Sequence, residues 1–175
     1  VLVQGFPGRS VCHGSLGWST LSLLRGQGRT LLVDVGSFGV RHVLSQQLHF
    51  RGVAAEDVTD VLLTHAHYDH AVNFTLFPNA RIWIGAQELS WAAAQPLGLS
   101  LDVDATEDRA QSQATLDALW RLWRAQPGTL LVPGHDLCMV LDEAGQIQYQ
   151  GERQASIDAW FSESLARTTR VNLGP

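Results

Sequence analysis

The sequence predicts a single domain with a mixed α/β fold, and three observations carry this prediction. The chain has 175 residues, which is the usual length of one domain. Short apolar runs typical of strands are interspersed with stretches of helical periodicity, as in layers of helices packed on a sheet. Antiparallel hairpin patterns open and close this series. We therefore expect one α/β or α+β domain spanning residues 1–175.

Each strand is predicted from a short apolar run that ends at a turn signal. The first two runs flank Gly26-Gln27-Gly28 and form a hairpin. Both are mostly apolar, which is typical of a sheet covered on both faces. A second hairpin is centred on Ala144-Gly145. The expected strands are residues 18–24, 30–35, 61–64, 81–85, 129–132, 139–141 and 147–149.

Helices are predicted where apolar residues recur every three to four positions. The clearest case is residues 111–124, where Leu116, Leu119, Trp120 and Trp123 fall at i, i+3, i+4 and i+7. All six Trp residues are expected in the core. The other expected helices are residues 40–49 with Val43, Leu44 and Leu48 on one side, residues 86–94, and a C-terminal helix with a stripe of Ile157, Trp160, Phe161 and Leu165.

The composition excludes several classes of protein. The net charge is −5 and the basic residues, all Arg, form no stripe, so no nucleic-acid partner is expected. No apolar run approaches the roughly 18 residues of a membrane span, so no membrane partner is expected either. Cys12 and Cys138 form no disulfide framework. A cytoplasmic location is expected, although the chain starts at Val1 rather than Met and a signal peptide could have preceded it.

The strongest chemical signal is Thr64-His65-Ala66-His67-Tyr68-Asp69-His70, which follows a predicted buried strand. Alternate residues of an extended segment face one way, so His65, His67 and Asp69 can converge while His70 turns beside them. Imidazole and carboxylate groups are ligands for zinc and similar divalent ions. A solvated polar loop is the alternative, and the density of imidazoles favours a metal site.

Pro133-Gly134-His135-Asp136 adds a candidate ligand after another predicted strand. Gly134 allows the backbone to turn, so that His135 can reach inward. The alternative is a hydrogen-bonded surface His, and the presence of a metal motif elsewhere favours the ligand role. His13 is a spare candidate, although a structural role is favoured for it because a lone His carries little information.

These motifs resemble those of the metallo-β-lactamase superfamily of metal-dependent hydrolases. Residues 64–70 match the HxHxDH signature of that family, and residues 32–37 are similar to its strand ending in Asp and Gly. Residues 133–136 resemble its final His motif. Residues 73–79 and 88–91 are similar to the branch that contains acyl-homoserine lactonases. The resemblance covers most of the chain.

The resemblance implies an αββα sandwich with two divalent ions at one edge. Zinc is the favoured ion, and iron or manganese are alternatives. Asp34 would support the ligand loop without binding an ion, and a turn-capping Asp before Gly is an equal alternative. Asp69 would also be catalytic, because it would orient the attacking water and pass a proton to the leaving oxygen. The implied ligands are His65 and His67 for the first ion, and Asp69, His70 and His135 for the second.

The family has two further ligands that find no match between His70 and His135: a His in a Gly-His context and an Asp that bridges the ions. The resemblance therefore implies a missing internal segment near residues 96–104, so that the fold lacks part of its second half. One of three nearby Asp residues could instead bridge the two ions, but a role as exposed acids at the start of the next helix is favoured for them. These acids are Asp102, Asp104 and Asp108.

Two functions are left open by these residues. The leading prediction is a hydrolase that uses a metal-activated water on a small ester, lactone or thioester. The alternative is a metal-binding protein of the same fold without catalysis, a remnant or a regulator, because two ligands have no match. A small-molecule substrate is the expected partner, and a homodimer is left open.

Overall fold

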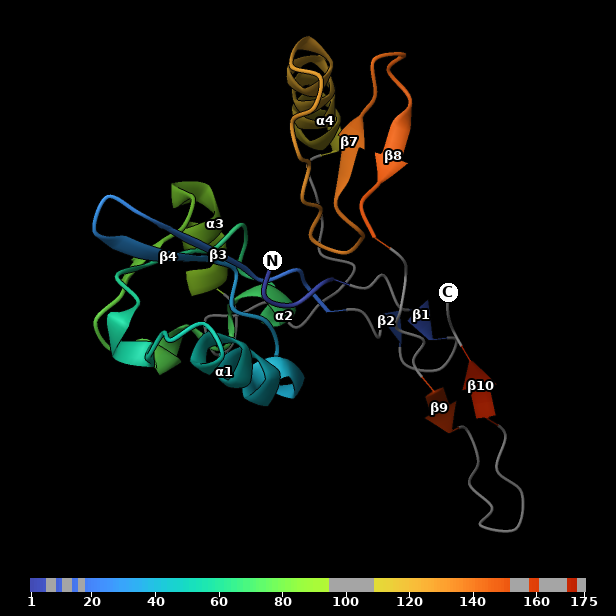
Figure 1. Cartoon of the computed structure of the whole chain (residues 1–175). Coiled ribbons are helices and arrows are strands. Elements are labelled where there is room, and N and C mark those ends of the chain that lie inside the picture. Colours follow the sequence, from blue (N-terminus) through green and yellow to red (C-terminus); the bar gives the residue numbers. More distant parts are fainter. Residues whose placement is uncertain are drawn as a thin grey trace.

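The fold consists of a four-stranded sheet with its helices and a separate helix–hairpin unit (Figure 1). This mixture of helices and strands confirms the predicted α/β class. No helix in the described part of the chain is long and apolar enough to cross a membrane. The computed structural model describes residues 1–5, 9–10, 14–15, 18–94, 109–151, 158–160 and 170–172.

The central sheet consists of β3 (Ser22–Gly26), β4 (Arg29–Val33), β5 (Asp60–Leu62) and β6 (Arg81–Trp83), in that order. The strands β3 and β4 form the predicted antiparallel hairpin, and β4, β5 and β6 run parallel. Gln27 and Gly28 in the hairpin turn have positive φ angles of 50° and 72°, as a two-residue type I′ turn requires. Because β4 and β5 are parallel, the loops that follow them leave the same edge of the sheet.

One face of the sheet is covered by α1 (Arg41–His49), as Figure 1 shows. Leu44 and Leu48 of α1 are buried in one core cluster with Leu32 of β4. Burial of such a side chain contributes about 1.5–3 kcal/mol. Val43, predicted on the same side, is 40% exposed, because neighbouring residues of a helix point about 100° apart.

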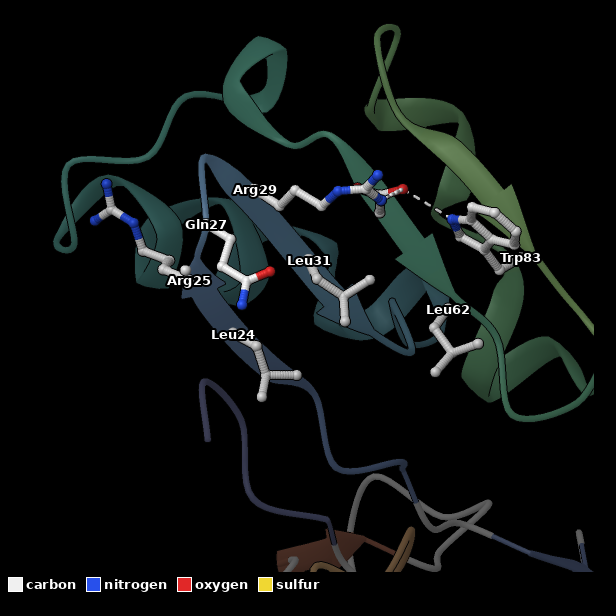
Figure 2. A pocket seen from close by; sticks show the side chains of 9 residues that line it. Leu24, Arg25, Gln27, Arg29, Leu31, Leu62 and Trp83 are labelled. Atoms are coloured by element: carbon white, nitrogen blue, oxygen red, sulfur yellow. Dashed lines mark hydrogen bonds and ion pairs between the residues drawn. The ribbon is translucent and has the colours of Figure 1, made fainter.

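In the described part of the chain, the opposite face of the sheet carries exposed apolar side chains, so the prediction that both faces are covered is wrong for these residues. Leu24, Leu62 and Trp83 are 52%, 40% and 47% exposed. Together with Leu31 they line a hollow of about 540 Å³ (Figure 2). An apolar pattern records which side chains are apolar but not what packs on them. The prediction that every Trp lies in the core fails for the same reason at Trp83 and at Trp120, which is 41% exposed.

Asp60 is buried on this open face and ties neighbouring strands together. Its carboxylate accepts hydrogen bonds from the indole N–H of Trp83 at 2.8 Å (Figure 2) and from Thr59 Oγ1 at 2.7 Å. Nitrogen atoms of Arg29 and Arg81 lie 3.4 and 3.5 Å from Oδ1 of the same carboxylate. The two hydrogen bonds, and after them the two Arg charges, lower the pKa of Asp60 below its usual value.

The helix–hairpin unit has its own small core. It consists of α4 (Arg109–Ala125) and the predicted second hairpin, β7 (Met139–Leu141) and β8 (Ile147–Tyr149). Trp123 is buried with Met139 and Leu141. The rest of the predicted apolar stripe is exposed, with Leu116 and Leu119 at 57% and 49%, because the three-residue strands pack on the end of α4 that carries Trp123.

One predicted strand, and three residues of a predicted helix, differ in the structure. Residues 129–132 make no strand but a single antiparallel bridge between Leu131 and Met139, since Pro133 has no N–H to extend the pairing. Within the stretch predicted as a C-terminal helix, the described residues Asp158–Trp160 form a strand, β9, which pairs antiparallel with β10 (Arg170–Asn172). Pairing with β10 overrides the local periodicity of these three residues. Ile157, Phe161 and Leu165 lie outside the described residues.

The remaining elements are short. The strands β1 (Arg9–Ser10) and β2 (Gly14–Ser15) pair with each other. The helices α2 (Tyr68–Ala71) and α3 (Ala86–Ala93) follow β5 and β6, and α3 confirms the helix predicted at residues 86–94. Single turns of 3-10 helix lie at Phe38–Val40, Ala55–Asp57 and Phe74–Leu76.

Candidate metal centre

The predicted ligand motif runs from the end of β5 into α2. His67 is the residue before α2 and has the extended backbone of a helix N-cap, with φ −63° and ψ 145°. Asp69 lies in the first turn of α2, and the next residue, His70, is only 2% exposed. The strand end and the short helix therefore present Asp69 and His70 side by side at one edge of the sheet.

His70 is fixed from two sides by the loop after β4. Its Nδ1 lies 2.7 Å from Asp34 Oδ2, and its carbonyl oxygen accepts hydrogen bonds from the N–H groups of Val35 and Gly36 at 2.8 and 3.1 Å. An ionised carboxylate only accepts, so Nδ1 carries the hydrogen and Nε2 presents its lone pair. Asp34 also accepts from the N–H of Thr64 at 2.8 Å, which fixes the start of the ligand loop.

The loop after β4 requires particular residues to take this shape. Asp34 is 2% exposed and has a φ of 55°, in the left-handed region that Asp tolerates better than most residues. Gly36 has a φ of 75°, and a Cβ atom there would lie 2.3 Å from Val40 Cγ2. Only glycine fits this position without moving the chain.

His135 reaches the same place from the loop between α4 and β7. Thr20, just before β3, fixes this loop. Its N–H donates to the carbonyl oxygen of Gly134 at 2.6 Å, and its Oγ1 donates to that of Pro133 at 2.7 Å. The His135 side chain is 39% exposed, so the site is open to solvent on this side.

The ligand atoms of Asp69, His70 and His135 converge. The two Nε2 atoms are 3.1 Å apart, and Asp69 Oδ2 lies 3.6 Å from His70 Nε2 and 3.4 Å from His135 Nε2. A triangle with these sides has a circumscribed radius of about 2.0 Å, and zinc binds His nitrogen and carboxylate oxygen at about 2.0–2.2 Å. One ion can therefore contact all three atoms. Three protein ligands with an open fourth position are typical of catalytic zinc sites.

His65 and His67 lie beside this group of three. The ring centroid of His65 is 4.0 Å from that of His70 and 4.6 Å from that of His67. Within the described residues, no further side chain joins His65 and His67 in a second group of three ligands. Burial, and after it the charges of His70 and His67, lower the pKa of His65 to about 4. His65 is therefore neutral at pH 7, the form that binds a metal.

Helix α3 supports the ligand loop, a role that was not predicted from the sequence. Glu88 Oε1 accepts a hydrogen bond from the N–H of Ala66 at 2.8 Å. The rings of Trp91 and His67 form a T-shaped contact, with centroids 6.2 Å apart. The i, i+3 spacing of Glu88 and Trp91 puts both on one face of the helix, but nothing in the sequence links that face to the loop.

The predicted site residues thus fall into three groups. The structure brings together Asp69, His70 and His135, the set that the resemblance implies for one ion. His65 and His67 flank this set, and Asp34 holds the ring of His70. The remaining candidates lie outside the described residues: His13, Asp102, Asp104 and Asp108.

Comparison with protein families assigns this fold. The model of the metallo-beta-lactamase superfamily matches residues 19–145. The chain belongs to the metallo-beta-lactamase superfamily. The branch with the acyl-homoserine lactonases and the missing segment near residues 96–104 stay predictions.

The chain is similar to metallo-beta-lactamase domain-containing protein 1 from two vertebrates. It is 38% identical to the Mus musculus protein over 76 residues, which are 43% of this chain and 29% of that protein. It is 46% identical to the Xenopus laevis protein over 55 residues, 31% of this chain and 24% of that protein. The chain thus spans less than a third of the length of these relatives.

Among solved structures, the chain is similar to a Thermotoga maritima protein assigned to the metallo-beta-lactamases. The identity is 30% and the TM-score is 0.45, over 49% of this chain and 41% of that chain.

Proposed function

We propose that this chain is a metal-dependent hydrolase that acts on a small ester, lactone or thioester. The observation that supports it is the convergence of Asp69, His70 and His135 on a triangle whose size suits one zinc ion. A divalent ion held there would supply a nucleophilic water at neutral pH and would polarise the substrate carbonyl. The exposed side of His135 leaves a path for a small molecule.

The residues around the ion would have distinct roles. His70 and His135 would bind it through Nε2, and the hydrogen bond to Asp34 would keep His70 in the tautomer that can do so. Asp69, whose carboxylate lies near both imidazoles, would orient the attacking water and would carry its proton to the leaving oxygen. His65 is neutral at pH 7 and would be able to bind a second ion beside the first.

Zinc is the proposed ion, with iron or manganese as alternatives, because imidazole and carboxylate suit all three. Two ions are proposed for the active protein, the first held by His65 and His67 with a further ligand, and the second by Asp69, His70 and His135.

A second candidate function is metal binding without catalysis. It is favoured by one observation, that the described residues supply one group of three ligands while His65 and His67 find no third partner among them. The amount of metal bound per chain separates the two functions. Two tightly held ions favour the hydrolase, whereas one ion that is lost to mild chelation favours the binding protein.

The direct test measures hydrolysis of lactones, thioesters and esters by the full chain loaded with zinc or manganese. Asp69→Asn and His135→Ala should lower kcat/KM by about 100-fold or more. His49→Ala removes an exposed imidazole of α1 and should leave kcat/KM unchanged. The hydrolase proposal is wrong if both site variants hydrolyse every substrate as fast as the unmodified protein.

A further inference from the structure

The metal ligands come from two segments that are far apart in the sequence. Asp69 and His70 belong to α2, whereas His135 lies 65 residues after His70, next to the helix–hairpin unit. A ligand set of this kind works only if the distance between its two halves is fixed, because metal–ligand bonds tolerate errors of only a few tenths of an ångström. A structural element that contacts both halves would provide this.

Thr20 holds the half that carries His135. It is 4% exposed, and it uses both its N–H and its hydroxyl on consecutive carbonyl oxygens, those of Gly134 at 2.6 Å and Pro133 at 2.7 Å. The same hydroxyl accepts a hydrogen bond from the N–H of Gly5 at 3.0 Å. Because the hydroxyl both donates and accepts, its direction is set, and the two hydrogen bonds from Thr20 hold the loop before His135.

Ser19 holds the other half. Its side chain is fully buried, and its Oγ donates a hydrogen bond to the carbonyl oxygen of Asp69 at 2.5 Å. Ser19 and Thr20 are neighbours, so their Cα atoms are held about 3.8 Å apart by the peptide bond. This dipeptide lies just before β3, and the pairing of β3 with β4 anchors the dipeptide to the sheet. It therefore connects both halves of the ligand set to the rigid part of the fold.

We infer that Ser19 and Thr20 are positioning residues, which set the distance between the Asp69–His70 pair and His135 and so tune metal affinity. This inference rests on the proposed function, since it takes these three side chains as the metal ligands. The distance between His70 and His135 is set in the metal-free protein, so it can be measured separately from metal binding.

The first experiment measures the metal-free protein by NMR. The Nε2 atoms of His70 and His135 are 3.1 Å apart, so protons of the two rings should show a nuclear Overhauser effect. Thr20→Val keeps the shape but removes the hydroxyl, and it should weaken this effect, whereas Thr20→Ser should retain it. Thr75→Val, at an exposed Thr, is the matched control. An undiminished effect in Thr20→Val overturns the inference.

The second experiment measures zinc affinity by competition with a chelator. Thr20→Val and Ser19→Ala should each weaken binding by about tenfold, as loss of a residue that supports a ligand does, and Thr20→Ser by less than about threefold. Ser45→Ala, at an exposed Ser of α1, should bind zinc like the unmodified protein. Ser19→Ala acts on the other half of the site, so it provides a test if Thr20→Val does not fold.

A double-mutant cycle separates positioning from a general loss of stability. If Thr20 acts through His135, Thr20→Val should have no further effect on zinc affinity in a His135→Ala background. An equal loss in that background overturns the inference. Absence of zinc binding by the unmodified protein refutes the proposed function instead, and the ring-to-ring effect in Thr20→Val and Thr20→Ser still decides whether Thr20 positions His135.

Discussion

Replacing Asp34 by Asn should weaken metal binding strongly while the fold stays intact. In the native loop Asp34 Oδ1 accepts from the Thr64 N–H at 2.8 Å, and Oδ2 lies 2.7 Å from His70 Nδ1. The Thr64 N–H needs an acceptor, so the carbonyl of Asn must take the place of Oδ1. Its NH₂ group then faces His70 and donates to Nδ1. The hydrogen of His70 moves to Nε2, the atom that the metal needs.

The size of the effect follows from these contacts. Loss of a carboxylate that supports a metal-binding His typically weakens affinity by about 10–100-fold, and an Nε2 that carries a hydrogen should place Asp34→Asn at the upper end of that range. The stability of the metal-free protein should change by less than about 1 kcal/mol, because every donor keeps a partner. Asp34→Ala leaves the buried donors of Thr64 and His70 unpaired and should cost about 2–5 kcal/mol.

Two measurements on the same preparations check this reasoning. Zinc affinity is obtained by competition with a chelator, and the free energy of unfolding by urea denaturation of the metal-free protein. The expected pattern is a loss of affinity in both variants and a loss of stability in Asp34→Ala alone. Zinc binding by Asp34→Asn that equals the unmodified protein would refute the assigned tautomer of His70.

Three further predictions concern the sheet and the ligand loop. Because the pKa of Asp60 is lowered in the folded protein, its stabilising effect is complete above the unfolded pKa of about 3.9 and is lost as pH falls through the folded pKa. Urea midpoints of Asp60→Asn should therefore fall less between pH 5 and pH 2.5 than those of the unmodified protein. An identical fall in both proteins contradicts this. Leu32→Ala empties a fully buried position and should cost about 2–5 kcal/mol in urea denaturation, and a loss below about 1 kcal/mol would place Leu32 outside the core. Glu88→Ala should speed hydrogen exchange of the Ala66 amide, whereas Glu88→Gln, which keeps an acceptor, should not; equal exchange in both variants would show that the amide is protected by other means.

The sequence predicted those features of the fold and the site that depend on residues close together in the chain. Three imidazoles and a carboxylate at the end of an apolar strand are rare enough to identify a ligand loop, and Gly before His135 marked the second one. The hairpin, the strand predicted at residues 61–64 (observed as β5, Asp60–Leu62) and the helix after β6 followed from period and turn signals. These features depend on neighbours in the sequence, which is why they could be predicted.

The contacts that support the ligands could not be predicted in this way. Thr20, Ser19 and Glu88 act through one or two hydrogen bonds each to backbone atoms 22 to 114 residues away. Polar residues of these types occur at many other positions. The exposed sheet face and the exposed apolar stripe of α4 show a second limit of prediction from sequence. Apolar periodicity identifies a side that can be buried, but burial depends on whether another element packs there.

The separation of the two ligand segments has a consequence for folding. The sheet strands join neighbours in sequence order, with only two residues between β3 and β4. His70 and His135, in contrast, are 65 residues apart in the sequence. Contacts within short loops form first, because closing a loop costs more entropy as it lengthens, by about 0.6 kcal/mol for each doubling. The helix–hairpin unit is therefore expected to dock last. An ion bound between the segments acts as a reversible cross-link, so metal supply would decide whether this chain unfolds in one cooperative transition or in two steps.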